Sequence, residues 1–232
     1  MANLQYRKVS SIGKPSYTPN DEKEATTYTM CIVTEGDVEE LEYIKGFFRK
    51  FLDNNKITPK YVNDSFANDD KEKHASHPQR RLAALKRFRA SVHPNWKEYP
   101  DDISWLVCDR DSQSFKESQY DEVLNDCNNE KVKLIISNPA FQLWLLMHLV
   151  STIDIDALNK NSTSPNQRKY IEKEIRKHIP YQHGKLNFSV FEDKVDNAVS
   201  VSKTLPTDLI ELKTQCGTNF AMLIETLKQY AK

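Results

Sequence analysis

Glycine is scarce in this chain, with 5 residues among 232, and long apolar runs are missing. So few glycines exclude Gly-rich repeats, flexible glycine linkers and the glycine fingerprint of dinucleotide-binding proteins. No window of about 18 residues is apolar throughout, and the N-terminal MANLQYRKVSS lacks the apolar core of a signal sequence. We therefore expect a cytoplasmic protein that makes no membrane contact.

Cysteine is also sparse, and the spacing of the cysteines does not match a metal site. The four cysteines never approach Cys-x-x-Cys spacing, which disfavours a zinc site or a disulfide framework. Two of them, Cys31 and Cys108, fall inside predicted strands. We interpret those two as small buried hydrophobic residues rather than nucleophiles.

Net charge is zero, yet the charges are segregated along the chain. Residues 71–97 hold eight Lys/Arg against one Glu, whereas residues 101–130 hold nine Asp/Glu against two Lys/Arg. A carboxylate site for metal beside a basic surface for a polyanion would need such a division. Two solvated helix faces of opposite sign would give the same pattern.

The order of elements predicts an α/β fold with a parallel sheet. Apolar, β-prone runs at 28–34, 58–63, 103–108 and 133–137 alternate with helical patterns at 38–54, 78–92, 116–128 and 140–150. Strands that alternate with helices favour parallel pairing through right-handed crossovers. Asn138 and Pro139 predict the start of the fourth helix, as an N-cap followed by proline in the first turn.

The rest of the chain divides into two further parts. Residues 1–27 are polar and without periodicity, which predicts an N-terminal arm before an α/β domain at 28–150. Residues 151–232 contain no convincing strand. Helical patterns at about 165–179, 189–204 and 218–231 predict a helical C-terminal part.

Acidic residues follow two of the predicted strands. Glu35 and Gly36 come after the first strand, and Asp109 and Asp111 follow the third. Because the carboxyl ends of parallel strands meet at one edge of a sheet, we expect these side chains to converge there. Crowded carboxylates repel one another unless a cation neutralises them, and Mg²⁺ prefers carboxylate oxygens. The alternative is a pair of ordinary acidic loops.

These motifs resemble the Toprim domain of topoisomerases, primases and OLD-type nucleases. The likeness is closer to the RloB-like family, in CIVTEGDVEELEYIKGF (31–47), WLVCDRD (105–111), ISNPAFQLWLLMHL (136–149) and, more weakly, CGTNFAMLIETL (216–227). The resemblance implies a Toprim-like parallel sheet flanked by helices. It also implies a metal-dependent nuclease of DNA or RNA, tRNA included, acting in abortive anti-phage defence with an ATPase partner.

Site residues can be carried over from the resemblance by position. Glu35, Asp109 and Asp111 fall on the Toprim metal positions, where they would hold Mg²⁺ or Mn²⁺. Glu40 matches the second glutamate of the family's first motif and would assist by ligation or by positioning water.

The chain departs from the family pattern at two positions. Glu39 stands where the family usually has threonine, and Gln142 stands where it usually has glutamate. A neutral amide cannot supply negative charge or act as a base. Gln142 therefore favours an alternative function, a catalytically weakened or non-catalytic effector or sensor subunit that docks a partner protein.

Other candidates lie outside these motifs. Arginines and lysines on the predicted helix at 78–92 could bind the phosphates of nucleic acid or dock an acidic partner. His148 could be a base or a hydrogen-bonded structural residue. His183 and Lys185 could reach a phosphate or could simply belong to a surface loop. The basic residues of the helix are Arg80, Arg81, Lys86, Arg87 and Arg89.

Overall fold

The computed structural model describes residues 28–36, 38–53, 56–62, 77–92, 103–161 and 163–231. Its centre is a five-stranded sheet of order β2-β1-β3-β4-β5. Four strands are parallel, and the fifth runs antiparallel to β4. The predicted α/β class with a mostly parallel sheet is thus confirmed, while the predicted arm at 1–27 lies outside the described residues. The strands are β1 (Tyr28–Thr34), β2 (Ile57–Tyr61), β3 (Ile103–Asp109), β4 (Val132–Asn138) and β5 (Gly217–Thr218).

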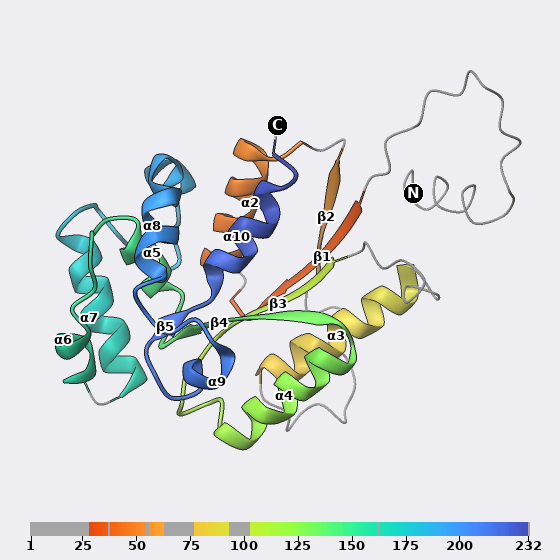
Figure 1. Cartoon of the computed structure of the whole chain (residues 1–232), viewed down its shortest axis with the longest axis horizontal. Coiled ribbons are helices and arrows are strands. Elements are labelled where there is room, and N and C mark those ends of the chain that lie inside the picture. The colour runs from red at the N-terminus through yellow and green to blue at the C-terminus, as the bar shows by residue number, and fades with distance from the viewer. Residues whose placement is uncertain are drawn as a thin grey trace, which may run out of the picture.

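Helices bury both faces of the sheet (Figure 1). Met30 and Ile32 of β1 join one apolar core, whereas Cys31 and Val33 join the other. This alternation follows from the two-residue period of a strand, and it explains why the strands read as continuous apolar runs. One face is covered by α2 (Glu39–Phe51) and α10 (Phe220–Lys228), and the opposite face by α3 (His77–Val92) and α4 (Glu117–Asn129).

The segment around Asn138 differs from the prediction. Asn138 is the last residue of β4, pairs with Gly217, and donates its side-chain amide to the Leu212 carbonyl at 2.9 Å. It therefore caps no helix, and α5 (Gln142–Met147) begins later and is shorter than predicted. Strand β5 was not predicted because two residues are too short to show a period.

The C-terminal part is helical as predicted, apart from β5. Helices α7 (Ser164–Arg176), α8 (Val195–Ser202) and α10 overlap the three expected segments, but α8 is about half as long as the helix expected at 189–204. They share one apolar core with the sheet, since Ile171, Val199 and Phe220 belong to the same cluster as Trp105. Shorter elements are α6 (Ile155–Asn159), α9 (Leu209–Leu212), η4 (Phe188–Val190) and η5 (Glu192–Lys194). None of the helices in the described ranges is both long and apolar enough to span a bilayer.

Candidate functional site

Glu35 and Asp109 lie side by side at the carboxyl edge of the sheet. Strands β1 and β3 are parallel neighbours, with Thr34 opposite Val107. The Glu35 backbone N–H donates to the Val107 carbonyl at 2.8 Å, and the Asp109 N–H donates to Glu35 Oε2 at 3.0 Å. The structure thus brings these two acids to one edge, as the strand order predicts.

A cleft of about 410 Å³ opens at this edge, and we call it the carboxylate cleft. All four acids that the sequence singled out line it, together with one further glutamate, Glu39. The cleft is lined by Glu35, Gly36, Val38, Glu39, Glu40, Asp109, Asp111, Ser114, Gln142, Arg168, His183 and Gly184.

The Asp109 carboxylate is held by two donors. Its Oδ1 accepts from the Phe141 backbone N–H at 2.8 Å, and its Oδ2 accepts from Arg168 Nη2 at 3.1 Å. Arg168 comes from α7, in the C-terminal part of the chain. Sequence reasoning missed this residue, because a single arginine in a polar helix gives no signal of what it faces.

Burial and mutual repulsion raise the pKa values of three cleft carboxyls. Burial raises the pKa of Glu35 to about 7, with Glu40 adding to the rise, while the hydrogen bond from the Asp109 N–H opposes it. Burial, and then Glu39, raise the pKa of Glu40. Burial, and then Glu40 and Glu35, raise the pKa of Asp109 well above its usual value. Arg168 lowers all three pKa values and so offsets part of this cost.

The donor set of the cleft fits a hard divalent cation. Carboxylate oxygens are the ligands that Mg²⁺ and Mn²⁺ prefer, and a cation would remove the repulsion that raises the carboxyl pKa values. In the described ranges, however, no three Asp, Glu, His or Cys side chains are already gathered as metal ligands. Oxygens of Glu35 and Asp109 are turned toward backbone N–H groups and Arg168 instead.

Glycine at position 36 gives Glu40 its place. The Glu40 carboxylate lies against Gly36, and a Cβ on residue 36 would overlap it. Glu40 lies in the first turn of α2, where the positive end of the helix dipole favours negative charge. Any other residue at position 36 would therefore displace the Glu40 carboxylate from this place.

The two departures from the family pattern touch each other. Gln142 Nε2 donates to Glu39 Oε2 at 2.5 Å, and both side chains are buried. Glu39 Oε1 also accepts from the Tyr181 hydroxyl at 2.8 Å and from the Gly184 backbone N–H at 2.9 Å. Gln142 Oε1 is buried and has no hydrogen-bond partner among the described residues. Glu39 thus contributes a carboxylate to the lining of the carboxylate cleft, next to the neutral amide of Gln142.

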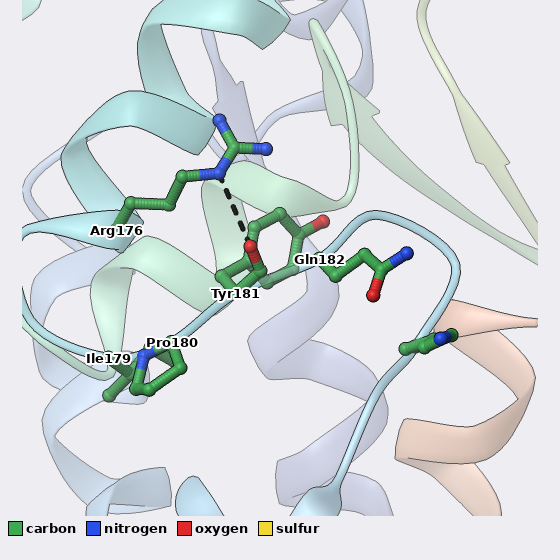
Figure 2. A pocket seen from close by; sticks show the side chains of 6 residues that line it. Arg176, Ile179, Pro180, Tyr181 and Gln182 are labelled. Carbon is green, nitrogen blue, oxygen red and sulfur yellow. Dashed lines mark hydrogen bonds between the residues drawn. The ribbon is translucent and has the colours of Figure 1, made fainter.

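His183 and Lys185 lie on the same loop but in different surroundings. His183 Nδ1 is 3.4 Å from Glu172 Oε1 and 3.6 Å from Glu39 Oε2, at the rim of the carboxylate cleft. Lys185 instead lines a pocket of about 570 Å³ with Arg176. Figure 2 shows that pocket, where Arg176 Nε donates to the Tyr181 carbonyl at 3.2 Å.

Two arginines of α3 are structural. Arg81 Nη2 donates to the Glu35 carbonyl at 3.0 Å, and both Nη atoms of Arg89 donate to the Glu130 carbonyl at 3.1 Å. Both side chains are buried, so we correct their assignment to an exposed phosphate-binding face. Arg80, Lys86 and Arg87 are less buried, so phosphate binding stays a prediction for these three residues, although Lys86 also pairs with Glu130.

His148 is held inside the core. The Tyr43 hydroxyl lies 2.8 Å from His148 Nε2, and Nδ1 is 2.9 Å from the Trp144 carbonyl. Because a carbonyl only accepts, Nδ1 carries the proton and Nε2 accepts from Tyr43. Burial lowers the pKa of His148 to about 4. These contacts favour the structural interpretation of His148.

Fold and site together define an α/β protein with a mostly parallel sheet and a buried carboxylate cleft at the carboxyl edge. The family model described as RloB-like protein matches residues 30–227, so the chain belongs to the RloB-like family. Comparison with curated proteins and with solved structures gave no match.

Proposed function

We propose that this protein is a Toprim-type nuclease that hydrolyses phosphodiester bonds with a divalent metal ion. The observation that carries the proposal is the carboxylate cleft, where Glu35, Glu40, Asp109 and Asp111 converge from two neighbouring strand ends and α2. Five acids line the cleft, and the pKa values of three of them are raised, so a cation bound there would relieve their mutual repulsion.

Each cleft residue has a distinct task in this proposal. Glu35, Asp109 and Asp111 would hold Mg²⁺ or Mn²⁺, which when bound lowers the pKa of water and stabilises charge on phosphate. Glu40, seated against Gly36, would position the attacking water. The hydrogen bond from the Asp109 N–H to Glu35 fixes the two strand ends relative to each other, so the cleft keeps its shape.

Family membership supports the biological setting of the proposal. The chain belongs to the RloB-like family, and the resemblance of its motifs to Toprim and RloB-like proteins implies DNA or RNA as substrate and a cytoplasmic effector of anti-phage defence with an ATPase partner. Less buried cations of α3, Arg80 and Arg87 among them, offer contacts for a polyanion.

A second candidate function is a non-catalytic effector or sensor subunit. Gln142 favours it, because an amide replaces the acid at a wall of the cleft. In that case both the acidic cluster of the cleft and the basic residues of α3 would dock a partner protein.

Cleavage that depends on metal separates these functions. Purified protein is incubated with plasmid, single-stranded DNA and tRNA in Mg²⁺, Mn²⁺ or EDTA. We expect cleavage of at least one substrate that EDTA abolishes. A protein that binds its ATPase partner but cleaves none of the three substrates, with or without that partner, would support the docking subunit instead.

A further inference from the structure

A second hollow adjoins the carboxylate cleft along α7, and we call it the α7 hollow. It measures about 350 Å³ and shares Asp111, Arg168 and His183 with the cleft. Its remaining lining comes from α7 and consists of Ser164, Pro165, Lys169 and Glu172. A nucleic-acid strand in the cleft would therefore have the cations Arg168 and Lys169 beside it, while the carboxylate of Glu172 in the same lining is paired with Arg176 at 2.9 Å.

The loop after β3 fixes the beginning of α7. The Ser112 backbone N–H donates to Ser164 Oγ at 3.3 Å, and the two serine hydroxyls are 3.1 Å apart. Residues four apart lie on one face of a helix, so Arg168 follows Ser164 on the face that looks toward Asp109 and Asp111. The position of the Arg168 guanidinium is thus set by the same loop that carries the acids.

Arg168 has hydrogen-bonding capacity to spare at this position. Its Nη2 is 3.1 Å from Asp109 Oδ2, whereas its Nε is buried without a hydrogen-bond partner in the described ranges. About a third of the side chain remains exposed, at 35%. A guanidinium presents a planar fork of donors that matches the two free oxygens of a phosphodiester.

We propose that Arg168, assisted by Lys169, binds a phosphate of the nucleic-acid strand in the α7 hollow. The inference rests on the proposed nuclease function and adds a substrate-binding residue to it. Without a divalent cation, Arg168 Nη2 pairs with Asp109 Oδ2 at 3.1 Å and stabilises its carboxylate. A cation at the cleft carboxylates takes over that task, because it attracts Asp109 and repels the guanidinium. The fork is then released toward the phosphate next to the reacting one.

This exchange predicts opposite effects of one substitution on two ligands. Arg168→Gln removes the cation that competes for Asp109, so Mn²⁺ binding, measured by isothermal titration, should become several-fold tighter. The affinity for a short fluorescein-labelled oligonucleotide, measured by anisotropy in Ca²⁺, should fall about tenfold. Wild-type protein should bind the oligonucleotide more tightly in Ca²⁺ than in EDTA, and the variant should lose this difference.

Three further variants sharpen the test. Arg168→Lys keeps the charge without the fork and should restore part of the oligonucleotide affinity. Lys169→Gln should weaken oligonucleotide binding and leave Mn²⁺ binding unchanged. Lys173→Gln, an exposed position on the same helix, is the control and should change neither.

The proposal is overturned if Arg168→Gln weakens Mn²⁺ and oligonucleotide binding together, because Arg168 would then only support Asp109. Unchanged oligonucleotide affinity would overturn it as well. The measurements of Mn²⁺ binding and of oligonucleotide binding do not depend on cleavage. A wild-type protein that binds these ligands as described but hydrolyses nothing would contradict the nuclease function and leave the phosphate site standing.

Discussion

Gln142 on α5 donates its amide to the Glu39 carboxylate on α2 at 2.5 Å, and both buried side chains line the carboxylate cleft. The contact joins the two positions at which this chain departs from the RloB-like pattern. A glutamate at both positions would place two buried carboxylates against each other, and their repulsion would be costly. The glutamine at 142 therefore suits the glutamate at 39, and the negative charge of this wall comes from α2.

Gln142→Glu should destabilise the metal-free protein near neutral pH by about 3 kcal/mol, because a donor becomes a second buried carboxylate. The double variant Glu39→Gln/Gln142→Glu should recover most of that loss, since an amide again faces an acid. Urea unfolding with EDTA measures both. Additive effects of the two single changes would contradict this pairing. If position 142 faces the cation, added Mg²⁺ should raise the free energy of unfolding of Gln142→Glu more than that of wild type.

The pKa of Glu35, raised to about 7 by burial, predicts how stability varies with pH. Above pH about 4.5 the unfolded chain loses this proton first, whereas the folded chain keeps it until about 7. The stabilisation present at low pH is therefore lost as the pH rises through this window, by about 3 kcal/mol. In metal-free protein, Glu35→Gln should make the free energy of unfolding fall less steeply as the pH rises.

Thermal and urea unfolding between pH 4 and 8 measure this profile. Glu211→Gln, at an exposed position on α9, is the matched control and should keep the wild-type slope. A Glu35→Gln variant whose unfolding free energy falls as steeply as that of wild type would show that Glu35 does not titrate in this window.

The basic residues of α3 should divide into two groups. Arg80→Ala with Arg87→Ala should weaken nucleic-acid binding and lower the salt-dependence slope by about 2, roughly one per lost phosphate contact. Arg81→Ala should instead lower the unfolding free energy, because it removes the donor to the Glu35 carbonyl. Anisotropy over a salt series and urea unfolding distinguish the groups, with Lys160→Ala as the control.

Unchanged nucleic-acid binding in the Arg80/Arg87 variant, together with lost association to an ATPase partner, would assign α3 to docking. This outcome would leave the carboxylate cleft unaffected, since neither side chain lines it.

His148 predicts a loss of stability in acid. Burial lowers its pKa to about 4, so the unfolded chain takes up a proton below pH about 6.5 while the folded chain stays neutral. Stability present above 6.5 should fall as the pH drops toward 4, by about 3 kcal/mol. His148→Gln should remove this acid sensitivity. A variant with the acid sensitivity of wild type would contradict the buried, neutral state of His148.

Much of the fold was readable because the strands are buried on both faces. Four apolar runs between helical patterns gave the parallel sheet, and the acids after β1 and β3 gave its carboxyl edge. The helix start predicted at Asn138 was wrong, because Asn138 pairs as a strand residue with Gly217, which lies far away in sequence, and this pairing overrides the local capping pattern. The contacts of Arg168 with Asp109 and of Tyr181 with Glu39 could not be predicted from the sequence, because they depend on how the C-terminal part packs against the sheet.

The most direct test of the central claim is a Mn²⁺ titration of wild type, Asp109→Asn and the exposed-site control Asp193→Asn, followed by calorimetry and thermal melting. Asparagine keeps an oxygen for the Phe141 N–H but removes the charge at the cleft. We predict that wild type and the control bind Mn²⁺ and melt at a higher temperature with it, while Asp109→Asn loses both responses and remains folded. Equal Mn²⁺ affinity in Asp109→Asn and wild type would contradict a metal site in the carboxylate cleft.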